Sequence, residues 1–245
     1  MDGEAIKELA QRLRGPQAID GFILAPNGWD AHDPAALVKP APSAKAFTVS
    51  TLSAVRDYLV ANRDALPIET LTVHVEGPNR VVVGGPLRAR SRDREYYVTA
   101  QAQDLTDGFL GKFMELEDFN IGLQVRFCDV EDRAKLLSLL SNVKSEMVKT
   151  ALDDGVTQVL EARAGVALVR EVAVPNPVRL APYRTFRDLP QPSSPYVLRV
   201  QNGRSGGLPQ VGLFEADGGA WKLTTTEQIR LWLRAALPAT VAVLA

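Results

Sequence analysis

Residues 71–83 read LTVHVEGPNRVVV, and this stretch decides the class of fold. Valines alternate with polar residues at its start, which is the period-2 pattern of a half-buried strand. Gly77, Pro78 and Asn79 supply a turn, and the valine run after them returns along the first strand. The sequence therefore predicts an antiparallel hairpin, with His74 on its polar face as a solvated strand residue rather than a ligand.

Helical and strand patterns flank this hairpin. Before it, Ser50 and Thr51 offer an N-cap, and apolar residues at helical spacing follow to about Asn62. After it, a third strand is predicted over residues 95–103. Residues 109–127 mix aromatic and acidic positions and are predicted to be helical after Gly111.

A further helix is predicted next, and the chain then turns to strands. Asp129 is placed to cap this helix, and Asp132 falls in its first turn near the positive end of the helix dipole. Its expected core stripe is Leu136, Leu140, Val143 and Met147. The later predicted strands cover residues 156–162, 166–174, 196–200, 211–214 and 241–244, with a last helix capped by Thr225 or Thr226.

Proline-rich segments divide the chain. A helix is predicted over residues 3–14 and a strand over 18–24. Residues 25–46 and 175–195 are rich in proline, so we expect each to form an extended arm able to reach a neighbouring molecule. The pattern is not the alternation of a doubly wound sheet, so we expect an α+β fold of mixed, mostly antiparallel sheets with several packed helices. The expected regions are 1–46, 47–150 and 151–245, the last strand-rich with a C-terminal helix, unless the chain is one continuous domain.

Composition narrows the class of protein. The 245 residues are 46% hydrophobic and 23% charged, enough for a substantial core, and the net charge of −1 is unlike that of a protein that coats nucleic acid. Cys128, the single cysteine, lies in an apolar stretch and is interpreted as a buried small hydrophobe. With no membrane-spanning run and an acidic N-terminus unlike a secretion signal, we expect a cytoplasmic protein with no membrane partner.

The sequence predicts no catalytic residues, no metal site and no cofactor. Two histidines and one cysteine give no zinc spacing, and the glycine-rich residues 202–207 do not match a Walker loop. Glu115, Glu117 and Asp118 leave open one enzymatic alternative, a metal-dependent nuclease that uses these carboxylates. Capping and dipole roles explain the same residues without a metal.

A row of arginines is the most specific local feature. Arg88, Arg90, Arg92 and Arg94 recur at every second position, which places their guanidinium groups on one face if the stretch is extended. Arg80 falls on the neighbouring predicted strand. Such a row suits phosphate or carboxylate recognition because each guanidinium donates two parallel hydrogen bonds. Pairing with acids across a subunit interface and a plain solvated surface are the other interpretations.

Several phrases together carry a resemblance to a known group of proteins. They are KFMELEDF (112–119), NVKSE (142–146), DDGVTQ (153–158), VPNPVRLAPYRTF (174–186) and LFEADGGAWKL (213–223). In this order they resemble a family of uncharacterised bacteriophage and prophage proteins, distantly similar to the YfdQ-like proteins of enterobacterial prophages. The resemblance implies a phage protein in the cytoplasm of a host bacterium and implies no activity or site residues.

The sequence therefore leads to one hypothesis with two alternatives. The hypothesis is a non-enzymatic phage accessory protein that self-associates into a homo-oligomer. The first alternative is a nucleic-acid-binding protein that uses the arginine row, and the second is the nuclease.

Overall fold

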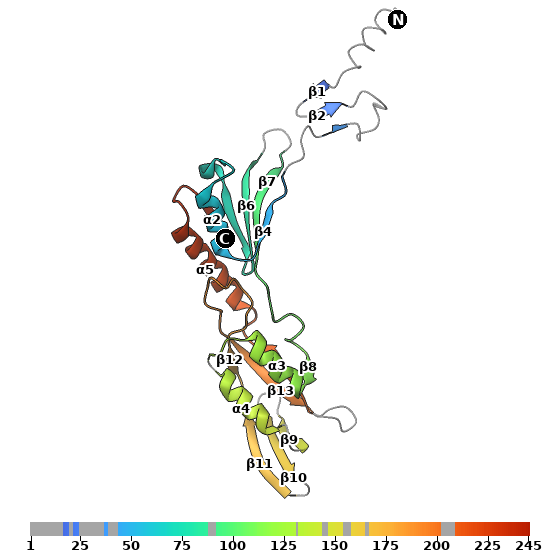
Figure 1. Cartoon of the computed structure of the whole chain (residues 1–245). Helices are drawn as coiled ribbons and strands as arrows, with labels where there is room; N and C mark the ends of the chain where they lie inside the picture. Colours follow the sequence, from blue (N-terminus) through green and yellow to red (C-terminus); the bar gives the residue numbers. More distant parts are fainter. Residues whose placement is uncertain are drawn as a thin grey trace, which may run out of the picture. The chain divides into compact units, whose positions relative to one another are not determined.

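The structure is a computed structural model, drawn in Figure 1. It describes residues 17–19, 22–24, 37–38, 44–87, 92–130, 132–143, 147–153, 158–164, 167–201 and 209–245, with side chains described outside 1–43 and 142–173. The chain forms two compact units: Met1–Ala46 with Leu87–Arg94, and Phe47–Pro86 with Glu95–Ala245.

The first unit contains a small antiparallel sheet. Its strands β1 (Gln17–Ile19), β2 (Phe22–Leu24) and β3 (Leu37–Val38) follow one another in the order β1-β2-β3. The single strand expected over 18–24 is therefore wrong. Ile19 pairs with Phe22, and the two residues between them are Asp-Gly, the dipeptide that short hairpins prefer. The helix expected over 3–14 lies outside the described residues.

A five-stranded mixed sheet organises one half of the second unit. Its order is β15-β5-β6-β7-β4, from β4 (Phe47–Val49), β5 (Thr72–Gly77), β6 (Arg80–Leu87), β7 (Arg94–Gln101) and β15 (Ala242–Leu244). The hairpin expected over residues 71–83 is confirmed as β5 and β6. Strands β4 and β15 pair in parallel with β7 and β5, which makes the sheet mixed.

Two helices pack on this sheet, α2 (Leu52–Ala61) and α5 (Ala220–Ala236), and a short 3-10 turn (Ile68–Thr70) precedes β5. Helix α2 begins where the sequence predicted, with Thr51 Oγ1 accepting a hydrogen bond from the Ala54 N–H. Helix α5 begins earlier than predicted, because the turn at residues 217–219 leads directly into it, and Thr225 lies buried inside the helix. The shared core includes Leu52, Val55, Leu59, Val73, Val75, Val81, Val83, Val98, Ala100, Ile229 and Leu233.

A four-stranded antiparallel sheet organises the other half of this unit. Its order is β12-β13-β14-β8, from β8 (Phe113–Glu115), β12 (Val178–Leu180), β13 (Ser194–Gln201) and β14 (Gln210–Glu215). Helices α3 (Leu116–Arg126) and α4 (Arg133–Val143) contribute to its core with Leu116, Phe119, Leu123, Leu136 and Leu140. The helix expected after Gly111 begins only at Leu116, because β8 intervenes and pairs with β14.

The start of α4 also differs from the prediction. Asp129 does not cap it: its carboxylate lies 3.6 Å from the Arg133 guanidinium. Asp132 directly precedes the helix and accepts hydrogen bonds from the Arg179 N–H and from Lys135 Nζ, which lower the pKa of the Asp132 carboxyl. This contact fixes the helix start to strand β12.

Three further strands form a separate antiparallel sheet in the order β11-β10-β9. They are β9 (Met147–Asp153), β10 (Gln158–Ala164) and β11 (Ala167–Val174). Met147 starts β9 rather than ending the core stripe of α4. Helices and largely antiparallel sheets occur in comparable amounts, so the expected α+β class is confirmed.

The proline-rich segment at 175–195 packs into the second unit. Leu180 and Phe186 are fully buried, and Thr185 donates a hydrogen bond to the Pro78 carbonyl. The expectation that this segment extends toward a neighbouring molecule is therefore wrong. Among the described residues, no helix is long and apolar enough to cross a bilayer.

Candidate functional site

Helix α3 carries apolar side chains on two sides, of which the described residues bury one. Leu116, Phe119 and Leu123 are buried against the four-stranded sheet. Ile121 and Val125, which lie one turn apart, are 53% and 61% exposed. The second side therefore carries two apolar side chains, one turn apart, that are each more than half exposed.

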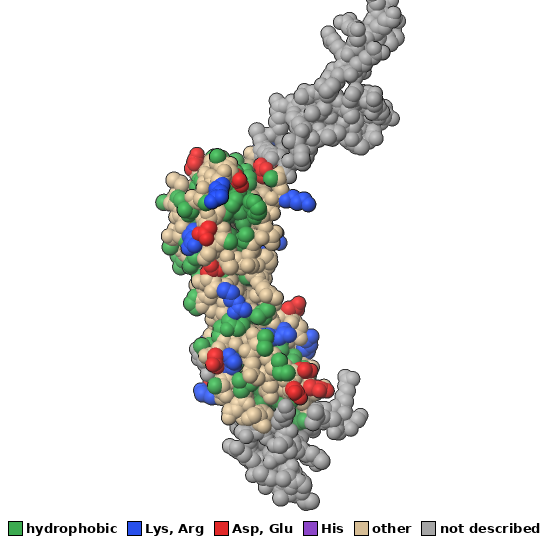
Figure 2. All heavy atoms as spheres, in the orientation of Figure 1, with side chains coloured by type: hydrophobic (Ala, Val, Ile, Leu, Met, Phe, Trp, Pro, Cys, Tyr) green, Lys and Arg blue, Asp and Glu red, His purple; other side chains and the backbone are tan. Residues whose placement is uncertain are grey.

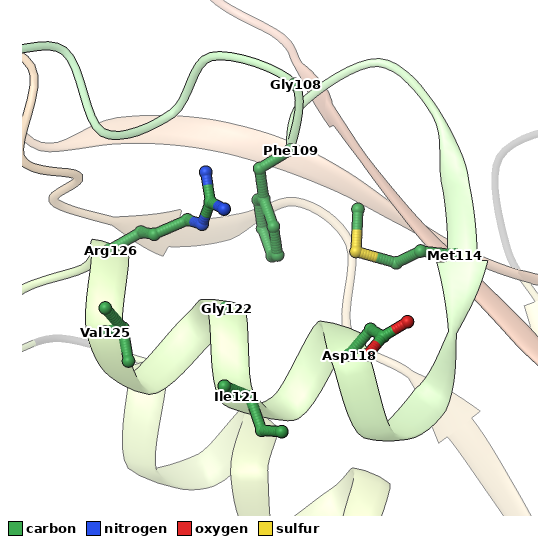
Figure 3. Close-up of a pocket in the computed structure, with 8 residues that line it drawn as sticks. All are labelled: Gly108, Phe109, Met114, Asp118, Ile121, Gly122, Val125 and Arg126. Atoms are coloured by element: carbon green, nitrogen blue, oxygen red, sulfur yellow. The ribbon is translucent and has the colours of Figure 1, made fainter.

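An open pocket of about 310 Å³ runs along this second face. Its walls are α3, the loop before β8 and β8 itself, and it is lined by Gly108, Phe109, Met114, Asp118, Ile121, Gly122, Val125 and Arg126. Figure 3 shows the Phe109 ring directed at the α3 backbone near Gly122, with Met114 reaching in from β8. Most of the lining is apolar, so the pocket suits hydrocarbon side chains.

A glycine allows the loop to approach the helix. A Cβ atom added at Gly122 would lie 2.2 Å from the Phe109 ring. That ring in turn packs on Phe119 and Phe127, with centroids 5.2 and 5.5 Å away. Phe109 is 2% exposed and so belongs to the core while forming the pocket wall.

Opposite charges mark the two ends of this face (Figure 3). Near the C-terminal end of α3, Arg126 Nη1 donates to the carbonyls of Leu105 (2.7 Å) and Asp107 (3.1 Å), and its guanidinium lies 5.6 Å from the Phe109 ring centroid. Within the described residues, Arg126 therefore bonds to neutral carbonyls rather than to a carboxylate. Asp118, exposed near the N-terminal end, makes no hydrogen bond or ion pair with any residue that the structure describes.

We call Asp118, Ile121 and Val125 the α3 stripe. Its apolar residues, Ile121 and Val125, were not predicted from the sequence to form a surface, although the signal is present. Ile121 and Val125 share helical spacing with each other but not with the core pair Phe119 and Leu123. Two apolar series on one helix indicate two packed faces.

A second concentration of polar groups surrounds Arg184, which is 2% exposed. Its guanidinium donates to Glu215 (2.5 Å), Ser194 Oγ (2.5 Å), the Tyr196 hydroxyl (3.1 Å) and the Pro192 carbonyl (3.2 Å). It also stacks 3.7 Å from the centroid of Trp221 on α5. The cluster joins the segment before β13 to the four-stranded sheet and to α5.

Further hydrogen bonds hold Ser194 and Asp217 in this cluster. Ser194 donates to Asp217 at 2.6 Å, and Asp217 also accepts from the Gly219 N–H. Burial raises the pKa of Asp217, but these hydrogen bonds and the Arg184 charge outweigh it and lower the pKa below its ordinary value. A carboxylate held ionised in this way is a weak general base for the Ser194 hydroxyl. His74, the histidine that the structure describes, lies exposed on β5.

The structure places the predicted arginines as follows. Arg80, at the start of β6, pairs with Glu76 at 2.7 Å. Arg92 has a φ of +56°, so the extended alternation is interrupted there, and Arg94 begins β7. Arg88 and Arg90 lie outside the described residues. Over the described residues, the face in Figure 2 carries acidic and basic side chains interspersed. The nucleic-acid role of the arginines stays a prediction.

The remaining candidates do not gather into one site. Glu115 ends β8 beside α3, while Glu117 and Asp118 lie in the first turn of that helix. Among the described residues, no three His, Cys, Asp or Glu side chains are grouped so that they could hold a metal ion. Cys128 is half-buried rather than buried, with its thiol free and its N–H bonded to the Ala181 carbonyl.

No protein-family model, curated protein or solved structure matches the chain. The resemblance to phage proteins and the cytoplasmic location therefore stay predictions from the sequence.

Proposed function

We propose that the protein is a non-enzymatic, self-associating protein whose contact surface is the α3 stripe with its adjoining pocket. The observation that carries the proposal is the uncovered apolar face formed by Ile121 and Val125 on a helix whose other face is already packed. Because the two side chains are already about half-buried, covering them is worth about 1 kcal/mol each, roughly half the value of a fully exposed side chain, which gives the surface a driving force for association.

A second copy of the same chain is the occupant that the charges favour. The stripe has at one end the Asp118 carboxylate, which pairs with no residue that the structure describes, and the Arg126 guanidinium lies beside its other end. Such a surface is complementary to itself when two copies of it meet in opposite orientations. A partner of one charge sign would leave one of these groups opposite a like charge.

Replacing both exposed apolar residues tests the proposal. We expect wild-type protein at tens of micromolar to show twice the single-chain mass in size-exclusion chromatography with light scattering. The double variant Ile121→Gln/Val125→Gln should run as a single chain. Because both residues are more than half exposed, its free energy of unfolding should change by no more than about 0.5 kcal/mol for each substitution.

Leu223→Gln is the matched control, since Leu223 is 80% exposed on α5 and lies outside the α3 stripe. It should leave the mass doubled. Wild-type protein that stays a single chain up to hundreds of micromolar would overturn the proposal, and so would a double variant that still dimerises.

A further inference from the structure

The α3 stripe has a spacing that fixes how two copies would meet. Asp118 and Arg126 are eight residues apart, which is about 12 Å along a helix axis. Gly122 lies midway between them. Resting on the proposed function, we propose that the exposed side of α3 pairs antiparallel with α3 of a second copy about a two-fold axis level with Gly122, with Asp118 opposite Arg126 of the partner subunit.

Charge selects the antiparallel arrangement over the parallel one. In a parallel pair, Asp118 would face its own copy and Arg126 would face its own copy, so both contacts would be repulsive. In the antiparallel pair, each Asp118 faces the partner's Arg126, and the same contact occurs twice by symmetry. The helix dipoles also favour this orientation, because the positive N-terminus of each helix lies beside the negative C-terminus of the other.

The apolar side chains interdigitate in the same register. Ile121 lies one residue before the axis and Val125 three residues after it. Ile121 of one copy therefore falls between the partner's Ile121 and the partner's Val125. Side chains that alternate in this way would lie along the pocket beside the Phe109 ring, which stays packed on Phe119 and Phe127.

Two consequences follow for the assembly. The interface uses the same patch on both copies, so it closes as a dimer and does not propagate into a filament. One 11-residue helix on each side buries less than the roughly 1,600 Å² of a standard stable interface. We therefore expect a dissociation constant in the micromolar range.

Cysteine cross-linking tests the register. In a Cys128→Ser background, Ile121→Cys should form a disulfide with its own copy under mild oxidation, because the two positions are about 3 Å apart along the axis. Asp118→Cys should not link to itself, since those positions are about 12 Å apart. A mixture of Asp118→Cys chains and affinity-tagged Val125→Cys chains should give the mixed disulfide.

The outcomes separate this inference from the proposed function. Light scattering on the Cys128→Ser protein first establishes that it dimerises like wild type. If the mass is doubled but Asp118→Cys links to itself, or no disulfide forms at any of the three positions, the antiparallel register is wrong. Self-association, the proposed function, would still hold in that case. A single-chain mass overturns both.

Discussion

Helices α2 and α3 are close in length, 10 and 11 residues, and each packs one face on a β-sheet, yet they differ at their ends and on their outer faces. Helix α2 has two side-chain caps at its N-terminus, Thr51 and the distant Asp188. The residue at the start of α3, Glu115, makes no capping hydrogen bond.

The two helices also differ in the apolar side chains that they expose. Helix α2 exposes one large apolar side chain, Val60, whereas α3 exposes Ile121 and Val125 in line beside a pocket. Side chains from two parts of the chain cap α2, whereas the described residues leave Ile121 and Val125 of α3 more than half exposed. This difference is the reason for placing the proposed contact surface on α3 rather than on α2.

The largest expected effect comes from the Arg184 cluster, which joins the half built on the four-stranded sheet to α5 in the half built on the five-stranded sheet. Arg184→Met should lower the free energy of unfolding by about 3 kcal/mol, because it leaves Glu215 and Ser194 without their buried partner and removes the stacking on Trp221. Urea denaturation followed by tryptophan fluorescence measures the loss.

Arg56→Met is the matched control for this substitution. Arg56 also pairs with a carboxylate, Asp57, and lies over an aromatic ring, Trp232, but at 39% exposure. Its removal should cost less than about 1 kcal/mol. Equal losses in the two variants would show that burial of the Arg184 cluster does not stabilise the junction.

A smaller effect is expected at Gly122 of α3, where Phe109 from the loop before β8 packs on the helix. Gly122→Ala places a Cβ atom 2.2 Å from the Phe109 ring and should lower the free energy of unfolding by about 1–3 kcal/mol, despite the better helix propensity of alanine. The same substitution at Gly77, where no atom lies within 4 Å of the added Cβ, should change it by less than about 0.5 kcal/mol. Thermal unfolding of the two variants tests the difference, and a Gly122→Ala variant as stable as Gly77→Ala would contradict the close approach.

The elements that the sequence predicted well are those set by local patterns. The hairpin of β5 and β6 and the helix after Thr51 follow from alternation, a turn and a cap within a few residues. The three-residue strand β8 was not predictable in this way, because it exists through its pairing with β14 about 100 residues later.

The candidate site likewise has a part that local sequence predicts and a part that depends on long-range contacts. Exposure of Ile121 and Val125 can be inferred from their spacing relative to the core residues of α3. The pocket requires Phe109 to fold back on Gly122, and the Arg184 cluster requires β13, β14 and α5 to meet. Such long-range contacts have no local signature, and the proline-rich pattern at 175–195 instead suggested an arm.

The smallest expected effect concerns the cap that α2 receives from Asp188, 136 residues away. Its carboxylate accepts from the backbone N–H groups of Leu52 and Ser53, both at 3.0 Å, and from Ser53 Oγ. Asp188→Ala should lower the free energy of unfolding by about 1–2 kcal/mol at pH 7. Asp57→Ala, which removes an exposed carboxylate from α2 itself, should cost less than about 0.5 kcal/mol.

The pH dependence of that loss identifies the ionised carboxylate as its cause. Burial raises the pKa of Asp188, but the hydrogen bonds from Ser53 and Leu52 outweigh it, so the pKa in the folded protein lies below the ordinary value of 3.8. A lowered pKa means that the contribution is complete above the unfolded-state pKa of about 4 and is lost as the pH falls through the folded-state value. The stability difference between wild type and Asp188→Ala should therefore be constant from pH 7 to about pH 5 and shrink below pH 4. A difference that stays constant down to pH 2 would mean that Asp188 stabilises α2 by packing and not by its charge.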